Sequence, residues 1–527
     1  MKLFKPAFAA VLSLAVATPA LAQQQAGAKN VILMISDGIG FNGWLASDYY
    51  QGRAGEQPYQ VTRPDGTEPV MVGMAHPSLT LLDATGAVLP NGVDPDKAAA
   101  AVPQGYDPQT RWNRFETTFR NDFPPVAEPY TSYTDSAAAG SAMQTGRKTA
   151  NGRVNMDWTG EVPLHSIAQI ALDQGRAAGA VSTVMASHAT PASVIAHQVS
   201  RDNYVEIFNE MVASELDVIM GAGHPLFDAS GNRIPESERD AETYKYVGGR
   251  ETWTKLTSEA GLNGYRFVDR VSGFRALAEG ENLPDRVVGI GRSNSTLQAQ
   301  RAGLPKGDTV SGMARRDDVP TLATMTVGAL NVLDQDPDGF YLMAEGGAVD
   351  WMGHANNMPR FIEEQTAFDE AVSAVISWVE ANSSWDDTLL IVTSDHETGG
   401  IWGAGTFRNG EGGPVATDRS KQALEAARFD PRADTFNEFR AVQNRGKGRL
   451  PGYQWASGNH TNELVPLWAI GAGAGRLAAF TRTDLDAAAL WGGAPYGWDG
   501  DYVDNTAVFH VMNRAFAAEL GRGTAGQ

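Results

Sequence analysis

Acidic and histidine side chains recur in this sequence just after short apolar runs, and a serine between them begins an alanine-rich stretch. The seven acidic and histidine residues are Asp37, Glu345, Asp350, His354, Asp395, His396 and His460. Strands of an α/β sheet carry active sites at their carboxyl ends, so we expect these side chains to converge there. Four carboxylates and three imidazoles gathered in one place would repel one another without cations. The pattern therefore predicts a site for several metal ions, built around the nucleophile Ser136.

Two of these motifs follow predicted buried strands directly. Asp37 follows the apolar run 30–36 and precedes Gly38, which allows a tight turn and leaves room for a ligand. Asp395 and His396 follow the run 388–393, and an adjacent pair of this kind can bind one cation where the chain bends. Taken singly, Asp37 is more simply explained as a turn residue. The combination of motifs favours a metal site.

The remaining acidic and histidine residues lie in less regular sequence. Asp350 and His354 are four residues apart and would share one face of a helical turn, although three nearby glycines disfavour a regular helix. Glu345 precedes them at the end of a predicted strand, and Trp351 between them forms part of the site wall or packs in the core. His460, taken alone, is more simply a surface or structural histidine. We expect these four acidic and histidine residues to share one site with Asp37, Asp395 and His396.

The serine motif reads as the start of a helix. Thr134 or Asp135 can cap a helix that begins in the alanine-rich sequence around Ser136. The positive end of the helix dipole favours an oxyanion at that position but is too weak to ionise a serine alone. A bound cation could do so, because it lowers the pKa of a coordinated hydroxyl by many units. No Gly-x-Ser-x-Gly elbow surrounds Ser136, which disfavours a Ser-His-Asp hydrolase.

The elements that position these residues are apolar runs alternating with helical patterns. The clearest helix covers 359–381, with apolar residues on one face and acids on the other. This alternation predicts an α/β fold with a large, mainly parallel central sheet flanked by helices. The runs that we interpret as buried strands are 30–36, 178–184, 340–343, 388–393 and 465–471.

The start of the chain has the three parts of an export signal. Lys2 and Lys5 precede the apolar run 9–17, and a small-x-small site ends at Ala22. We therefore expect residues 1–22 to be a signal peptide and the mature protein to be exported, most simply to the periplasm. The absence of cysteine excludes thiolate catalysis and thiolate ligands, so any metal is held by histidine and carboxylate. A formal net charge of −20 argues against nucleic acid or an anionic membrane as a partner.

The mature chain is expected to form one domain. Three stretches interrupt the alternation of strands and helices, namely 52–129, 225–318 and 406–455. Loops this long are usually functional or decorative insertions in a compact fold. Because the candidate ligands span Asp37 to His460 and must converge, we expect 23–527 to be a single catalytic domain with insertions near these three stretches.

These motifs, in this order, resemble those of the alkaline phosphatases, which are metal-dependent phosphomonoesterases with a serine nucleophile. The resemblance runs from Asn30 to about Gly473. It rests on the segments SDGIGF, TDSAAAGSAMQTGRKT, HATPASVIAHQVSR, EGGAVDWMGHANN, SDHETGG and GNHT. It implies the α/β sandwich of that family, two Zn²⁺ and one Mg²⁺ per subunit, phosphate monoesters as substrates and a homodimer.

The resemblance also implies a role for each matching residue. Ser136 would attack phosphorus and become a phosphoserine, while Arg201, oriented by Asp135, would clamp two phosphate oxygens. The implied ligands are Asp350, His354 and His460 for one zinc, Asp37, Asp395 and His396 for the second, and Asp37, Glu345 and Thr190 for magnesium. His188 and Trp351 stand where the best-known bacterial form has acidic and lysine residues. They are expected beside the substrate, and they leave the identity of the third metal open.

Two other functions stay open at this level. A phosphodiesterase or sulfatase of the same superfamily would share the strand-end ligands, but Ser136 lacks the Pro and Arg context of a sulfatase. A non-catalytic periplasmic binder of metal or phosphate would share the ligands without needing the serine. The retained nucleophile favours the phosphomonoesterase.

Overall fold

The computed structural model describes residues 27–89, 95–103, 105–106, 133–404, 440–455 and 458–524. The predicted signal peptide 1–22 lies outside the described residues. So do 90–94, 104 and 107–129 of the predicted insertion 52–129, and 406–439 of the predicted insertion 406–455. The central strands are β1 (Asn30–Ser36), β2 (Val70–Ala75), β5 (Ala177–Met185), β6 (Val218–Ala222), β7 (Arg266–Val268), β8 (Val287–Ile290), β9 (Phe340–Gly346), β10 (Thr388–Thr393), β15 (Val465–Gly471), β16 (Arg482–Thr483) and β17 (Asp501–Asp504).

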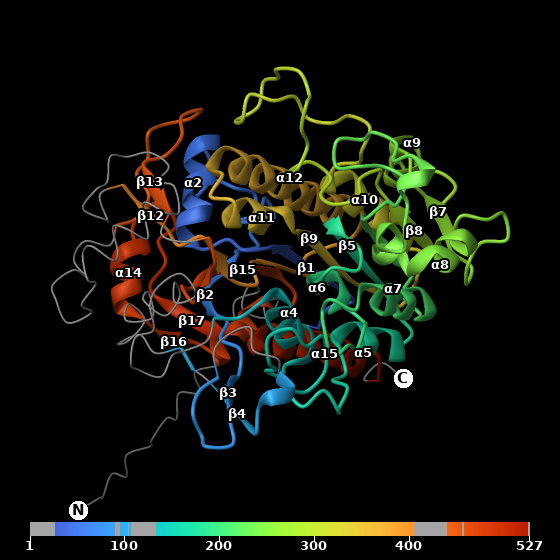
Figure 1. Ribbon diagram of the computed structural model, residues 1–527. Coiled ribbons are helices and arrows are strands. Elements are labelled where there is room, and N and C mark those ends of the chain that lie inside the picture. The colour runs from blue at the N-terminus through green and yellow to red at the C-terminus, as the bar shows by residue number, and fades with distance from the viewer. Residues whose placement is uncertain are drawn as a thin grey trace, which may run out of the picture.

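These strands form one sheet of 11 strands in the order β16-β17-β2-β15-β10-β1-β9-β5-β6-β8-β7. Every neighbouring pair from β10 to β7 is parallel, whereas β15 runs antiparallel to both β10 and β2. The mainly parallel sheet expected from the alternation of strands and helices is thereby confirmed. Four parallel strands, β10, β1, β9 and β5, lie side by side near its centre. Figure 1 shows β1, β9 and β5 among them.

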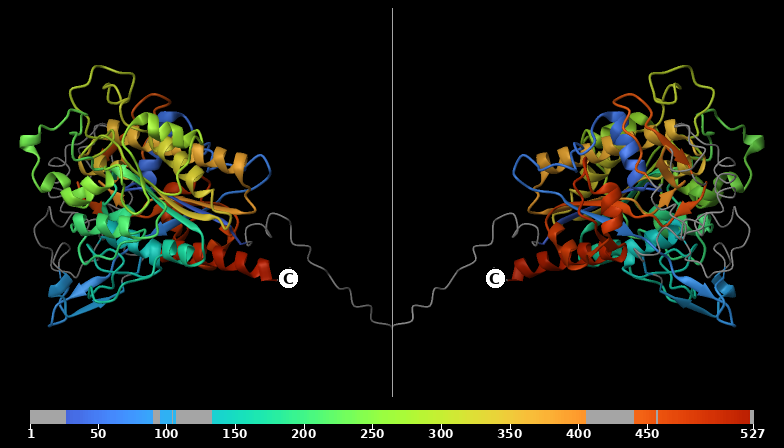
Figure 2. Two further views of the ribbon diagram at one scale, coloured as in Figure 1. Left: turned by 90° about the vertical axis from the view of Figure 1, so that its right-hand side faces the viewer. Right: turned by 90° about the vertical axis from the view of Figure 1, so that its left-hand side faces the viewer.

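Helices cover both faces of the sheet, as the side views show (Figure 2). The helices are α2 (Phe41–Gln51), α4 (Ser136–Thr145), α5 (Ile167–Asp173), α6 (Ala189–Ala192), α7 (Tyr204–Ala213), α8 (Gly249–Leu256), α9 (Val271–Ala278), α10 (Leu322–Leu333), α11 (Ala348–His354), α12 (Met358–Asn382), α14 (Leu485–Trp491) and α15 (Thr506–Thr524), with short 3-10 turns η1 (Pro95–Lys97), η3 (Glu236–Glu238), η4 (Glu242–Val247) and η6 (Ala474–Ala479). Apolar residues of α2, α9, α10 and α12 pack on one face, and those of α4, α5, α7 and α15 on the other.

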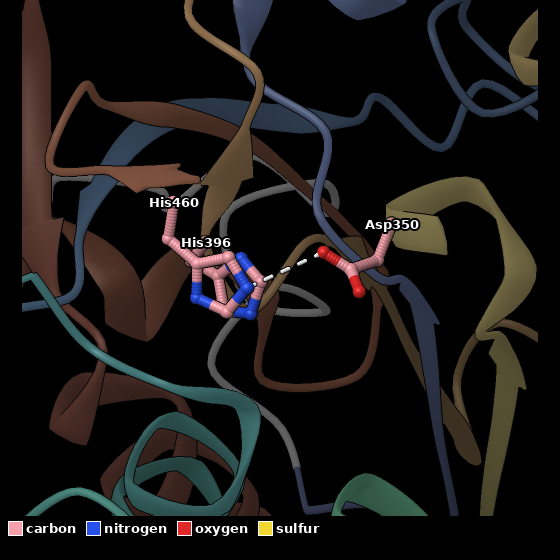
Figure 3. Close-up of side chains that lie close together, drawn as sticks. All are labelled: Asp350, His396 and His460. Carbon is pink, nitrogen blue, oxygen red and sulfur yellow. Dashed lines mark ion pairs between the residues drawn. The ribbon is translucent and has the colours of Figure 1, made fainter. Parts of the chain in front are cut away.

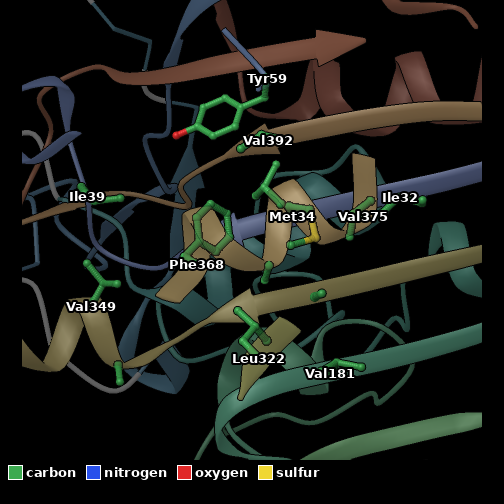
Figure 4. Close-up of a cluster of buried hydrophobic side chains, with 14 of the residues drawn as sticks. Ile32, Met34, Ile39, Tyr59, Val181, Leu322, Val349, Phe368, Val375 and Val392 are labelled. Carbon is green, nitrogen blue, oxygen red and sulfur yellow. The ribbon is translucent and has the colours of Figure 1, made fainter. Parts of the chain in front are cut away.

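Strand β1 shows how the core fixes the sheet. All seven of its residues are buried. Ile32 and Met34 face the α12 side, near Phe368 and Val375 (Figure 4). The alternate residues Val31, Leu33 and Ile35 face the α4 side. Burial on both faces explains why the strand reads as a continuous apolar run. Each such side chain contributes roughly 1.5–3 kcal/mol when fully buried, which anchors the strand whose end carries the first candidate ligand.

Three two-stranded sheets complete the described structure. They pair β3 (Thr80–Leu82) with β4 (Ala100–Val102), β11 (Glu397–Thr398) with β14 (His460–Thr461), and β12 (Ile401–Gly403) with β13 (Tyr453–Trp455). The β3–β4 hairpin projects from the body of the molecule (Figures 1 and 2). The stretches predicted as insertions also supply strands to the main sheet, β2 from 52–129 and β7 and β8 from 225–318. No helix among the described residues is long and apolar enough to cross a membrane.

Candidate active site

The central strands bring the first acidic residues to one edge of the sheet. In the parallel ladder, Ile35 of β1 lies level with Glu345 of β9 and with Thr393 of β10. Asp37 therefore leaves its strand beside Glu345, and Asp395 leaves beside both. Because these residues follow aligned strand ends, Asp37 becomes a neighbour of Glu345 and Asp395, which lie far along the sequence from it.

The turn after β1 leaves no space for a side chain at Gly38. Its backbone has φ +75°, and a Cβ added there would lie 2.7 Å from both Cα and Cβ of Asp350. The Gly38 amide also donates a hydrogen bond to Asp395 Oδ1 at 3.1 Å. The glycine therefore allows Asp350 on α11 to approach the turn after β1 closely.

The first group of candidate ligands consists of Asp37, Asp395 and His396, all fully buried. One ligand atom from each lies within 4.8 Å of the others. His396 Nε2 is 3.5 Å from Asp37 Oδ1 and 3.3 Å from Asp395 Oδ2. Ser136 Oγ lies 3.2 Å from the same imidazole nitrogen, so the serine borders this group.

The second group of candidate ligands consists of Asp350, His354 and His460. Nε2 of each histidine is 3.4 Å from Asp350 Oδ1, and the two Nε2 atoms are 3.1 Å apart. Asp350 and His354 lie one turn apart on α11, which forms despite the three glycines that disfavoured a regular helix. The His354 side chain is 41% exposed, so this group opens to solvent.

The two groups touch through their imidazoles. The His396 ring stacks on that of His460 with centroids 3.7 Å apart. As a result, Asp350, His396 and His460 also offer ligand atoms within 4.8 Å of one another (Figure 3). The seven predicted residues therefore form one continuous cluster, with Glu345 at its far end beside Asp37.

Backbone carbonyls fix the orientation of two histidines. His460 Nδ1 donates to Thr134 O at 2.8 Å, and His354 Nδ1 donates to Gly458 O at 2.6 Å. Because a carbonyl only accepts, each ring carries a proton on Nδ1, and Nε2 is the nitrogen that faces Asp350. An outer hydrogen bond of this kind is the usual way to orient a metal-ligating histidine.

Ser136 is the first residue of α4. Asp135 caps this helix, because its Oδ1 accepts the Ala138 amide at 2.9 Å. Its other oxygen accepts from Nη1 of Arg201 at 3.0 Å. The cap expected from sequence is confirmed as Asp135, and one carboxylate thus joins the serine helix to the arginine.

Burial makes the acidic part of the cluster electrostatically costly. The pKa of Asp37 is raised well above its usual range, chiefly by burial and then by the charges of neighbouring carboxylates. Burial likewise raises the pKa of Glu345 to about 7 and that of Asp395 to about 6. The pKa of His396 is lowered well below its usual range by burial and by His460. Protons or cations must therefore neutralise the carboxylates, while the imidazole stays neutral and able to ligate.

Unsatisfied oxygen atoms in the cluster match what a metal ion requires. Among the described residues, both carboxylate oxygens of Asp37, Oδ2 of Asp395, Oε1 of Glu345 and Oγ1 of Thr190 are buried without a hydrogen-bond partner. Buried polar atoms are nearly always paired, and leaving one unpaired costs about 1–3 kcal/mol. Hard oxygen ligands beside Glu345 and Thr190 suit magnesium, and the nitrogen and oxygen set around the histidines suits zinc. The residues present therefore fit the expected metals.

A cavity of about 870 Å³ opens above the serine. Ser136, Arg201, His188 and Trp351 all line it, and the His188 and Trp351 ring centroids are 5.9 Å apart. Burial lowers the pKa of His188 to about 3, with Arg201 adding to the effect. With a volume of about 870 Å³, the cavity is large enough for a phosphate with an attached alcohol.

Two supporting residues were missed at the level of sequence. Thr398 Oγ1 donates to Asp350 Oδ1 at 2.6 Å and lies 3.3 Å from His396 Nδ1, so it contacts both groups. Its place in SDHETGG was a usable signal. Ser182 donates to Glu345 Oε2 from inside β5, and nothing in that apolar run pointed to it.

Comparison with known proteins gives a consistent result. The family model described as alkaline phosphatase matches residues 107–484. Alkaline phosphatase 3 of Bacillus subtilis strain 168 is 28% identical over 394 residues, covering 68% of this chain and 74% of that protein. Alkaline phosphatase 4 of the same organism is 26% identical over 488 residues, covering 86% and 85%.

Solved structures agree in fold. The Thermus thermophilus alkaline phosphatase superposes with a TM-score of 0.55 at 20% identity, covering 97% of this chain and 96% of that one. The enzyme from the Antarctic bacterium TAB5 gives 0.52 at 20% identity, covering 94% and 99%. Since the family model matches well over half of the sequence, this chain belongs to the alkaline phosphatase family of metal-dependent phosphatases.

Proposed function

We propose that the protein hydrolyses phosphate monoesters to an alcohol and inorganic phosphate through a phosphoserine formed on Ser136. The observation that carries this proposal is the position of Ser136 Oγ, 3.2 Å from His396 Nε2 and beside a cluster of buried metal-ligating side chains. A serine hydroxyl is a weak nucleophile unless a base or a cation activates it. The cluster beside it is built for cations.

The proposed cofactors are two Zn²⁺ and one Mg²⁺. Asp350, His354 and His460 would hold one zinc, Asp37, Asp395 and His396 the second, and Asp37, Glu345 and Thr190 the magnesium. The short distances within each zinc set and the unpaired oxygens around Glu345 support this division. When bound, the zinc ions would favour the ionised serine and stabilise negative charge on the leaving oxygen.

The reaction consists of two displacements at phosphorus. In the first, Ser136 Oγ loses its proton and bonds to phosphorus as the ester P–O bond breaks, and the departing oxygen gains a proton to give the alcohol. In the second, a water oxygen bonds to phosphorus, the P–Oγ bond breaks, and Ser136 regains a proton. Two in-line displacements retain the configuration at phosphorus.

Arg201 is proposed to hold the phosphate. Asp135 accepts one of its guanidinium N–H groups, which fixes the plane of the fork and leaves other donors directed towards the cavity. A guanidinium matches two phosphate oxygens at once. His188 and Trp351 line the same cavity and are proposed to contact the substrate.

Charge supports a phosphate dianion as the substrate group. The chain as a whole is strongly acidic, with a formal net charge of −20. Three divalent cations would outweigh the four carboxylates of the cluster, and Arg201 adds a further positive charge. The site would then attract the dianion locally, whereas the same pocket without cations would repel it.

Neither alternative function gains support from the site. A diesterase needs room for a second ester group, and Arg201 and the predicted magnesium site occupy the region beside Ser136. A non-catalytic binder needs no nucleophile at the start of a capped helix. We further propose export through the signal peptide 1–22, a periplasmic location, a single catalytic domain over 23–527 and a homodimer.

The test compares three aryl esters, a phosphate monoester, a phosphate diester and a sulfate, with and without a metal chelator. We expect turnover of the monoester to dominate, to be lost on chelation and to return with zinc and magnesium. Ser136→Ala should remove the phosphoenzyme and nearly all turnover, whereas Ser258→Ala on the exposed surface should not. Dominant diester or sulfate turnover, or full activity in Ser136→Ala, would overturn the proposal.

A further inference from the structure

Asn151 is bound to both sides of the peptide segment that carries the nucleophile. Its Oδ1 accepts the Asp135 amide at 3.1 Å, and its Nδ2 donates to the Tyr133 carbonyl at 2.8 Å. The two hydrogen bonds enclose Thr134 and end one residue before Ser136. One side-chain amide therefore fixes the direction in which the chain enters α4.

The enclosed residue also orients a candidate metal ligand. Thr134 O accepts the Nδ1 proton of His460 at 2.8 Å, which keeps His460 Nε2 facing Asp350. Since Asn151 holds the peptide groups on either side of Thr134, it also fixes the direction of that carbonyl. A shift of the segment would move Ser136 and His460 together.

The next residue connects the same turn to the arginine. Gly152 N donates to Asp135 Oδ2 at 3.0 Å, and Gly152 O accepts the Arg201 backbone amide at 2.8 Å. Asp135 in turn accepts the Arg201 guanidinium. These contacts use the backbone of Gly152, so they persist when the Asn151 side chain is changed.

We propose that Asn151 is a positioning residue that holds Ser136 and His460 in a fixed relation to Arg201. The inference rests on the proposed function. Asparagine suits this place because the amide offers one acceptor and donors on a short, rigid side chain. Aspartate could still accept the Asp135 amide, but its second oxygen would face the Tyr133 carbonyl and repel it.

The test compares Asn151→Ala and Asn151→Asp with Asn331→Ala. Asn331 is a matched control, because it also joins separate segments through its amide, donating to the Leu277 and Ala278 carbonyls and accepting from Trp378, but on the opposite face of the sheet. The measurements are kcat, the inhibition constant of inorganic phosphate, and zinc retention against a competing chelator.

We expect both Asn151 variants to lose 10–100-fold in kcat and to release zinc more readily, as changes behind metal ligands generally do. With zinc and magnesium kept at saturating concentration, the inhibition constant of phosphate should change far less than kcat, because Arg201 keeps its contacts with Asp135 and Gly152. Asn331→Ala should lower thermal stability without altering kcat or zinc retention. Normal kcat and zinc retention in Asn151→Asp, which conserves shape, would overturn the inference.

Failure of this inference can be told apart from failure of the proposed function. If the wild-type protein does not turn over phosphate monoesters, the proposed function is wrong. If the wild type is active and the Asn151 variants behave like Asn331→Ala, only the positioning role is wrong.

Discussion

Replacing Gly38 by alanine should damage the metal centre far more than it damages the fold. The residue has φ +75°, where an L-residue costs about 1–2 kcal/mol relative to glycine. A new Cβ would also lie 2.7 Å from Cα and Cβ of Asp350. Relief to an ordinary carbon–carbon contact requires a movement of roughly 0.8 Å.

This movement would displace candidate metal ligands. Asp350 belongs to the second group of candidate ligands. Asp395 belongs to the first group, and its Oδ1 accepts a hydrogen bond from the Gly38 amide at 3.1 Å. Because a misplacement of about 1 Å can cost about 100-fold in rate, we expect kcat/KM to fall by roughly 10–100-fold. Zinc retention in the presence of a chelator should fall in parallel.

Gly280→Ala provides the control. Gly280 has the same φ of +75° at the end of α9, but a Cβ there would meet nothing within 4 Å. The two variants should therefore share the loss of thermal stability due to backbone strain, while only Gly38→Ala loses zinc and activity. Equal zinc retention and equal kcat/KM in both variants would refute the reasoning.

Two further outcomes can be checked with standard assays. Arg201→Lys should raise the inhibition constant of inorganic phosphate about 10-fold or more, because an ammonium cannot hold Asp135 and two phosphate oxygens in one plane; an unchanged constant in phosphate-inhibition kinetics would count against the clamp. Glu364→Gln should remove a pH dependence of stability. Burial raises the pKa of Glu364 to about 7, so the favourable protonated form is complete below the ordinary carboxyl pKa and is lost as pH rises through 7. Ionisation then costs the folded state roughly 3 kcal/mol. In denaturant unfolding, the free energy of unfolding of the variant should therefore rise relative to that of the wild type between pH 5 and pH 8. An equal difference in free energy at both pH values would contradict this.

Local sequence determined the strands and the principal helix well. The runs 30–36, 388–393 and 465–471 are the observed β1, β10 and β15, and the predicted helix 359–381 is α12 within one residue at each end. These elements are buried on their apolar residues, so the physical cause of their formation is visible in composition and periodicity. Asp135 as the cap of α4 is equally local, because a cap needs only its own next turn.

Contacts between distant segments could not be predicted as well from the sequence. The strands β2, β7 and β8 lie in stretches that lacked a clear pattern, and they take their place in the sheet from neighbouring strands. Helix α11 forms despite the three glycines because packing on α12 and β11 outweighs their low helix propensity. Asn151 and Ser182 form hydrogen bonds with residues outside their own elements, and such bonds leave no periodic pattern in the sequence.

The sequence by itself determined which chemical groups this protein has and which strand ends carry them, since strand formation and residue type are local properties. Only the tertiary structure decided their mutual distances, such as 3.2 Å from Ser136 to His396 and the stacking of His396 on His460. Those distances depend on strand order, register and the docking of α4 and α11, which are set by packing between segments hundreds of residues apart. The residue types therefore determine the available chemistry, and the packing of the sheet and helices determines the geometry of the site.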